Sequence, residues 1–181
     1  MKRFLSLTLI VLLVFSVFAM PAMAASGYSV KTTASVNLRK GPGLDYGKIT
    51  SVSSGKSFTY QGISQFDSRG IAWHKISYNG GTAWISWKYS NLQYNGNSID
   101  ESNCVQATAS VNLRAGAGTN YAKLTSVSKG KRLVYLGESQ NDSRGVRWYK
   151  VSCSKGIAWV SSRYSKLVAP GSSISSSTVV T

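Results

Sequence analysis

The chain contains one segment twice. Sliding the sequence by 75 positions aligns residues 33–92 with residues 108–167 without a gap, and about 35 of the 60 aligned residues are identical. The first seven residues of the two copies, Thr33–Arg39 and Thr108–Arg114, are the same. A repeat of this length predicts two small units of similar structure and argues against a single medium-sized domain.

Both copies have the pattern of short β-strands. Ala34, Val36 and Leu38 alternate with polar neighbours, which is typical of a half-buried strand. Further short apolar runs, separated by Gly, Ser and Asn, lie at residues 49–52, 58–60, 71–77 and 83–86. No window shows the apolar stripe of a helix. The sequence therefore predicts an all-β fold, with each copy forming a small barrel or sandwich.

Residues 1–24 have the three parts of a secretory signal peptide. Lys2 and Arg3 are followed by an apolar run that ends before Pro21, and the sequence Ala22-Met23-Ala24 offers small residues to a signal peptidase. An uncleaved membrane anchor is the alternative, but a run of about 17 residues is at the short limit for a span. We expect cleavage after Ala24 and a product that is secreted or associated with the cell wall, with no membrane span.

The charge of the chain points to an anionic partner. Lys and Arg number 21 against 6 Asp and Glu, a net charge of +15, and loss of Lys2 and Arg3 with the signal peptide lowers it to +13. Nucleic acid is the usual partner of so basic a chain, but export argues against it. We expect a cell-wall polymer or peptide, or another exported protein, as the partner, and a monomer in solution.

Few residues are available for catalysis or for metal binding. The chain has one His, two Cys and six acidic residues. His74 is replaced by Tyr149 in the second copy. Glu138 and Asp142 are the only acids close together within one of the two domains, and the counterpart of Glu138 in the first copy is Ile63. Because hydrolases need paired carboxylates, a nucleophile with its base, or a metal cluster, we expect no enzyme, no metal and no cofactor.

Cys104 and Cys153 lie at the start of the second copy and within it. Their counterparts in the first copy are Ser29 and Tyr78. Two cysteines in one domain of an exported chain favour a disulfide between them. Two unpaired thiols, or a link between two chains, are the alternatives.

The dipeptide Asn79-Gly80 predicts a tight hairpin turn. A two-residue turn at this position places Ile76 opposite Ala83 and Lys75 opposite Trp84. His74, Ile76, Ala83 and Ile85 then share the core-facing side of the hairpin.

The other side of this hairpin is a candidate binding surface. It carries Trp73 and Trp84 as diagonal neighbours with Lys75 and several Ser and Thr residues, so we expect the rings to be partly accessible. The second copy repeats the arrangement with Trp148, Lys150 and Trp159. Exposed rings beside a cation suit a sugar face or an extended peptide. The alternative is that loops cover the rings and the rings complete a small core.

Two more residue types in each copy are candidates. Arg39 and Arg114 end the first strand beside a Gly-rich turn, where a guanidinium group could bind a carboxylate with two hydrogen bonds or simply face solvent. Tyr46 and Tyr121 follow that turn and could lie in a groove or in the core.

A polar turn is also repeated. Residues 67–70 and 142–145 both read Asp-Ser-Arg-Gly. Such an Asp commonly accepts hydrogen bonds from its own backbone, and the Arg commonly points to solvent. We favour a turn role over a ligand role.

Several of these segments resemble the bacterial SH3 domain family. The family's opening pattern matches Val36–Gly43 with Tyr46, its Trp-Tyr-Lys-Val and Gly-x-Trp-Val segments match Trp148–Val151 and Gly156–Val160, and its closing Tyr-x-x-Leu matches Tyr89–Leu92 and Tyr164–Leu167. There are departures from the pattern, since Pro42 is Ala117 in the second copy and Ala83 and Ala158 replace a Gly before the second Trp.

The resemblance implies two SH3-like barrels of five to seven strands in tandem. The resemblance also implies a targeting function, in which such domains recognise cell-wall peptides or other envelope ligands, often beside a hydrolase domain. The expected function is a secreted, non-catalytic protein whose two domains bind peptidoglycan peptide or an anionic wall polymer. The alternative is an extracellular adaptor or structural subunit. The expected order is a signal peptide (1–24), a first domain (28–92), a linker (93–103), a second domain (104–168) and a disordered Ser-rich tail (169–181).

Overall fold

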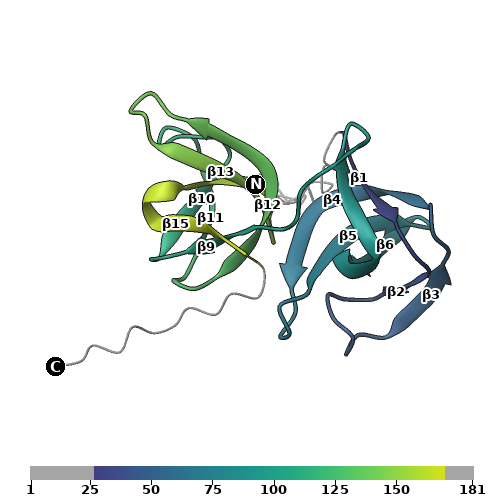
Figure 1. The fold of residues 1–181 in the computed structure, drawn as a ribbon. Coiled ribbons are helices and arrows are strands. Elements are labelled where there is room, and N and C mark those ends of the chain that lie inside the picture. The colour runs from purple at the N-terminus through teal and green to yellow at the C-terminus, as the bar shows by residue number, and fades with distance from the viewer. Residues whose placement is uncertain (1–26, 170–181) are drawn as a thin grey trace, which may run out of the picture.

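The computed structural model describes residues 27–169 and consists of two antiparallel sheets (Figure 1). The first domain has the strand order β3-β2-β6-β5-β4-β1-β7-β8. Its elements are β1 (Tyr28–Thr32), β2 (Val36–Arg39), β3 (Lys48–Val52), β4 (Ser57–Phe66), β5 (Ala72–Tyr78), β6 (Gly81–Ser86), the 3₁₀ turn η1 (Trp87–Tyr89), β7 (Ser90–Tyr94) and β8 (Asn97–Ser98).

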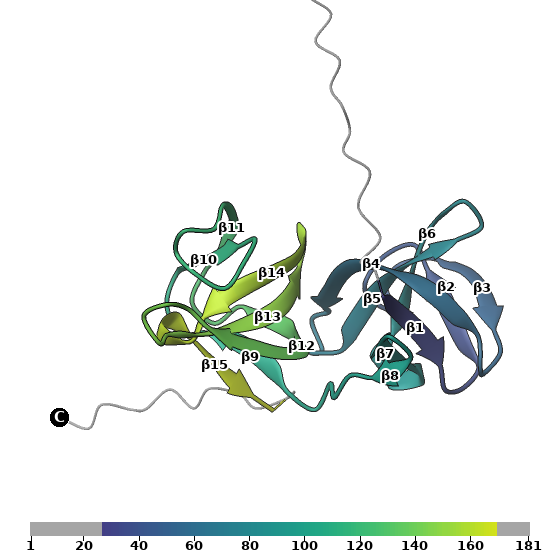
Figure 2. The same ribbon diagram turned by 90° about the horizontal axis from the view of Figure 1, so that it is seen from above.

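The second domain repeats this topology, with the order β11-β10-β14-β13-β12-β9-β15. Its elements are β9 (Cys104–Ala107), β10 (Val111–Arg114), β11 (Lys123–Val127), β12 (Arg132–Asn141), β13 (Arg147–Cys153), β14 (Gly156–Ser161), the 3₁₀ turn η2 (Ser162–Tyr164) and β15 (Ser165–Val168). The two bodies lie side by side in both views (Figures 1 and 2). The prediction of an all-β fold with two units is confirmed.

The hairpin of β5 and β6 has the predicted register. Ile76 pairs with Ala83, and Lys75 pairs with Trp84. Asn79 and Gly80 both have positive φ, 45° and 73°, as a type I′ turn requires. This turn matches the right-handed twist of the strands, so the local sequence sets which residues face the core.

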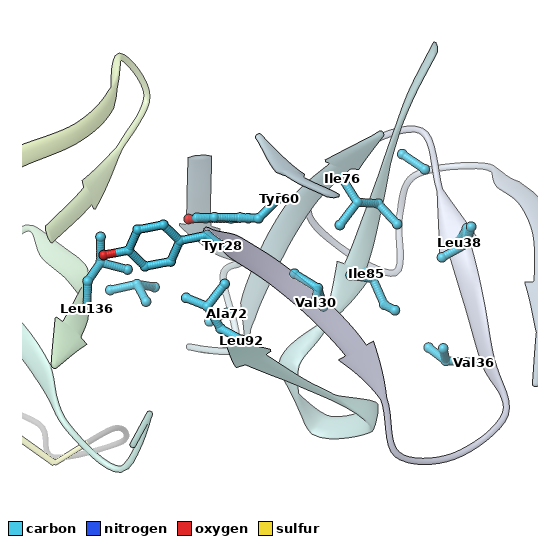
Figure 3. Packing of buried hydrophobic residues seen from close by; sticks show 12 residues of the cluster. Tyr28, Val30, Val36, Leu38, Tyr60, Ala72, Ile76, Ile85, Leu92 and Leu136 are labelled. Atoms are coloured by element: carbon cyan, nitrogen blue, oxygen red, sulfur yellow. The ribbon is translucent and has the colours of Figure 1, made fainter. Parts of the chain in front are cut away.

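Each domain has its own apolar core. In the first, Val30, Leu38, Ile76, Ile85 and Leu92 are fully buried between the curved strands (Figure 3). In the second, the fully buried residues include Val105, Leu113, Val151 and Val160. Small cores of this kind give limited stability to domains of this size.

The core of the first domain extends into the second domain. Val134 and Leu136 of β12 belong to the same buried cluster as Tyr28 and Tyr60, and Ile157 packs against it. Figure 3 shows Leu136 reaching the Tyr28 ring from the neighbouring domain. Strands β12, β13 and β14 all contact β4. The two domains therefore share a buried apolar interface.

A serine of β13 makes three hydrogen bonds across this interface. The Ser152 hydroxyl donates to the Gly62 carbonyl (2.9 Å) and accepts from Tyr60 Oη (2.8 Å) and from the Ser64 amide (2.6 Å). Gly62 has a positive φ of 74° within a bulge of β4. The bulge frees the backbone groups of β4 that Ser152 then pairs.

The segment between the domains also contacts the first domain. Residues 93–103, expected to be a linker, include the end of β7 and all of β8. Within the same segment, after β8, Glu101 Oε1 lies 2.9 Å from Nε2 of the fully buried His74, and Glu101 Oε2 accepts from the Leu92 amide (3.2 Å). Ile99 packs on the core of the first domain.

The disulfide expected between Cys104 and Cys153 is not formed in this structure. Both cysteines are free and buried, and burial raises the pKa of both thiols. Val134 of β12 pairs with Cys104 on one side and with Ser152 on the other. Two strand spacings amount to about 10 Å, which exceeds the roughly 7 Å that a disulfide can span between Cα atoms.

The expected signal peptide and residues 170–181 of the expected tail lie outside the described residues. No helix within residues 27–169 is long and apolar enough to cross a membrane.

Candidate ligand-binding site

A groove of about 600 Å³ lies on the first domain, between β2, the turn before β5, and η1. We call it groove 1. Its lining combines three cations with one acid and two aromatic rings: Arg39, Asp67, Arg69, Trp73, Lys88 and Tyr89.

The second domain has the same groove at the equivalent positions. Groove 2 encloses about 350 Å³, and each of its twelve lining residues lies 75 positions after a residue that lines groove 1. Nine of the twelve are identical. The residues that correspond to the set above are Arg114, Asp142, Arg144, Trp148, Arg163 and Tyr164.

Asp67 organises one wall of groove 1. Its carboxylate accepts from the amides of Arg69 and Ile71 (2.9 Å each), from Trp73 Nε1 (3.1 Å) and from Arg69 Nη2 (3.0 Å). Burial acts to raise the pKa of Asp67, but these hydrogen bonds outweigh it and hold the pKa below its usual value. The Asp therefore stays ionised and keeps the turn and the indole in place.

Asp142 does the same in groove 2. It accepts from Trp148 Nε1 (3.0 Å) and from the amides of Arg144 (2.9 Å) and Val146 (3.0 Å). The bond from Trp148 is the largest cause of a lowered pKa at Asp142. These hydrogen bonds hold both Asp-Ser-Arg-Gly segments as turns, which is the role that we favoured for them. The Asp and Arg side chains of the two turns also line the grooves.

The tryptophans are less accessible than the sequence suggested. Trp73 and Trp148 are 2% and 3% exposed, and Trp84 and Trp159 are 9% and 7% exposed. Ser86 and Ser161 on the same faces are buried as well. The expectation that these rings are partly accessible is wrong: the Trp73 indole bonds to Asp67 of the Asp-Ser-Arg-Gly turn, and β5 contacts η1. Trp73 and Trp148 contribute to the groove walls from within the packed structure.

Lys150 and Trp159 lie at the boundary between the domains. Lys150 Nζ is 5.7 Å from the centre of the Trp159 ring and 5.9 Å from that of Tyr28 in the first domain, and it pairs with Glu138 at 2.8 Å. Burial acts to lower the pKa of Lys150, but the bond to Glu138 and the nearby phenol raise it overall. The Lys150 side of the surface expected to be open in the second copy therefore lies against Tyr28 of the first domain.

Arg39 and Arg114 hold the neighbouring loop. Arg39 Nη1 donates to the carbonyls of Tyr46 (2.8 Å) and Leu44 (3.2 Å), and Arg114 Nη1 donates to the carbonyl of Tyr121 (2.8 Å). Both arginines line their grooves. The guanidinium groups thus bind backbone oxygens and shape the groove edge.

Tyr46 and Tyr121 sit beside the grooves and do not line them. Each ring packs on the Gly-rich turn, where a Cβ at Gly41 or Gly116 would collide with it. Trp84 and Lys75 do not line groove 1 either. Of the ten side chains expected to bind ligand, the grooves bring together Arg39 with Trp73 and Arg114 with Trp148.

Sequence reasoning missed an exposed aromatic residue and an exposed cation in each groove. Tyr89 and Tyr164 are 47% and 50% exposed, and Lys88 and Arg163 are exposed beside them on η1 and η2. The signal was the repeat itself, since the aromatic residue and the cation recur at the same positions in both copies. Within residues 27–169, no three His, Cys, Asp or Glu residues lie close enough to hold a metal.

A family model for the bacterial SH3 domain matches residues 34–91 and 109–166. The chain belongs to the bacterial SH3 domain family. Both matched segments contain a complete set of groove residues, so the family assignment covers both grooves.

One curated relative is similar to the whole tandem. It is a Bacillus subtilis (strain 168) protein provisionally named N-acetylmuramoyl-L-alanine amidase YrvJ, 29% identical over 177 residues. The match covers 93% of this chain and 31% of the relative, so the chain spans about a third of that protein's length.

This relative corrects the expected function. The sequence predicted a stand-alone binding protein without catalysis, with an adaptor as the alternative. The similar tandem is part of a protein named as a hydrolase, and not a protein on its own. This chain is therefore similar to one region of a cell-wall hydrolase. No catalytic domain is identified in the described residues, where the family model finds SH3 domains.

Proposed function

We propose that the tandem is the cell-wall-binding region of a peptidoglycan hydrolase, with grooves 1 and 2 as its ligand sites. One observation carries the proposal: both domains have the same groove, in a chain similar to a protein named as an N-acetylmuramoyl-L-alanine amidase. That name specifies an amide bond of peptidoglycan as the relative's substrate. A region that binds the same polymer would bring such chemistry to the wall.

The groove chemistry suits an acidic, extended ligand. Groove 1 has Arg39, Arg69 and Lys88 against the single acid Asp67, whose carboxylate is already bonded to Arg69 and Trp73. Tyr89 adds an exposed ring face. Peptidoglycan peptides are extended and carry carboxylates, which pair with cations, while a ring packs on their apolar atoms.

The exposed cations provide a test of this proposal. Replacing Lys88 and Arg163 with Ala removes one positive charge from each groove without breaking a side-chain bond described above. The double variant should pellet with purified peptidoglycan less than the wild type, with an apparent affinity lower by about tenfold, since charge-assisted bonds contribute roughly 1.5–3 kcal/mol each at most.

Lys48→Ala with Lys123→Ala is the matched control. These lysines are also exposed and also occupy equivalent positions, on β3 and β11, but line neither groove. The control removes the same total charge and should bind nearly as the wild type does. Equal losses in both double variants would mean that overall charge, and not the grooves, holds the wall.

Secretion to the wall follows as part of the same proposal. It is supported by the signal-peptide pattern of residues 1–24 and by the wall-related relative. Pulse labelling in an exporting bacterial host, with the mature N-terminus read by mass spectrometry, tests cleavage after Ala24.

A further inference from the structure

We infer that the two domains form one rigid unit that presents both grooves to a single peptidoglycan polymer at a fixed separation. The inference rests on the proposed function and adds a property to it: the ligand is a repeating polymer contacted at two points, and isolated wall fragments bind more weakly.

The shared core is the first observation. Leu136 and Val134 of β12 are each 4% exposed and lie in one buried cluster with Tyr28 and Tyr60 of the first domain. Side chains packed at interior density cannot slide past one another without opening voids. A hinge between the domains would have to expose this apolar surface to water.

Directional bonds fix the orientation. Ser152 bonds to three groups of β4 within 2.9 Å, and all of these groups are buried or in the bulge. Tyr60 Oη also contacts Ser64 Oγ (2.6 Å), which contacts His74 Nδ1 (2.8 Å). The chain of polar contacts then ends at Glu101, in the segment between the domains. Rotation of one domain would leave several buried polar groups without partners.

The two copies show which surfaces were kept and which were changed. The interface residues Val134, Leu136 and Ile157 are apolar, whereas the equivalent residues of the first copy are polar: Thr59, Gln61 and Thr82. The polar residues of the first copy are exposed or half-buried. The groove residues, by contrast, are nearly all retained. The second copy thus differs where it joins the first and agrees where we place the ligand.

A fixed pair of sites has a physical consequence for binding. Once one groove holds a polymer, the second meets the next repeat at a high effective concentration, and two weak sites can give an avidity of about 10²–10⁴ over one. The gain is largest when the separation of the sites matches that of the repeats. Loosening the joint between the domains lowers the effective concentration without touching either groove.

The test loosens the joint by using residues that the fold already accepts. The variant Leu136→Gln with Ile157→Thr places the first copy's residues at the equivalent interface positions. Residual dipolar couplings measured without ligand should fit one alignment tensor for both domains of the wild type and require two for the variant. Binding to intact peptidoglycan should fall by at least about tenfold, while binding to a soluble disaccharide-peptide fragment stays unchanged.

Each outcome decides a different claim. A wild type that needs two alignment tensors overturns the rigid unit. A variant that needs two tensors yet binds intact peptidoglycan as tightly as the wild type overturns the claim that a fixed separation of the grooves strengthens binding. If the wild type binds neither peptidoglycan nor its fragment, the proposed function fails, while the couplings still decide whether the unit is rigid. Unchanged chemical shifts of the groove residues show that the variant keeps both grooves.

Discussion

Asp67 and Asp142 connect local sequence to the shape of the grooves. Each carboxylate holds its own turn through two backbone amides and holds a tryptophan ring through Nε1. Replacing Asp67 with Ala should lower the free energy of unfolding by about 1–3 kcal/mol, because a buried indole N–H and a turn lose their acceptor. Urea unfolding followed by tryptophan fluorescence measures the loss, and Asp45→Ala, an exposed acid outside the groove lining, is the control.

The same carboxylates predict how stability depends on acid. The folded state holds the pKa of Asp67 and of Asp142 below the unfolded value of about 4. Their stabilising contribution is therefore complete above pH 4 and is lost as the pH falls through the folded values, because the unfolded chain then binds protons more readily. The slope of unfolding free energy between pH 4 and pH 2 should be shallower in Asp67→Asn with Asp142→Asn. An identical slope in that variant would contradict the assignment.

The β5–β6 hairpin is the element whose geometry is most local in origin. Gly80 has a φ of 73°, and no atom lies within 4 Å of the place that an alanine methyl group would take, so Gly80→Ala isolates the cost of backbone conformation. We expect a loss of about 1–2 kcal/mol. Gly81 lies next to it at an ordinary φ, and Gly81→Ala should cost less. Thermal unfolding of the two variants compares them directly.

The elements also show where sequence reasoning ends. The hairpin register followed from one dipeptide and an alternating pattern, because both act over a few residues. The burial of Trp73 did not follow, since its surroundings include η1, whose Lys88 and Tyr89 lie 15 and 16 residues away in the sequence, as well as the nearby turn at Asp67. The repeat marked these positions, but which repeated residues line a groove depends on tertiary folding.

At the scale of the whole molecule, the joint between the domains has its own signature in the sequence. Gln61 becomes Leu136 and Thr82 becomes Ile157, so polar surface positions of one copy are apolar in the other. A comparison of the copies could have identified this surface, although its partner in the first domain could not be named. The disulfide was a wrong expectation for a related reason: spacing along the chain does not reveal that β12 separates β9 from β13.

The joint predicts different effects of one mutation at two equivalent serines. Ser152→Ala removes three hydrogen bonds between the domains and should lower the unfolding free energy by about 1–3 kcal/mol. Ser77→Ala alters the same position of the first copy, where the half-buried hydroxyl bonds only to Gln61 among the contacts described, and should cost under about 1 kcal/mol. Chemical denaturation of both variants, with intrinsic fluorescence as the readout, gives the comparison. Equal losses would mean that Ser152 does not join the domains.

The exposed tyrosines test the claim that the repeated groove binds the wall. The measurement is co-sedimentation with purified peptidoglycan in about 1 M NaCl, where charges are screened beyond about 3 Å. We predict that the wild type still pellets and that Tyr89→Ala with Tyr164→Ala does not. Tyr46→Ala with Tyr121→Ala, equally exposed but outside both grooves, should pellet as the wild type does. Undiminished pelleting of the Tyr89 and Tyr164 double variant would contradict the assignment of the grooves as the wall-binding sites.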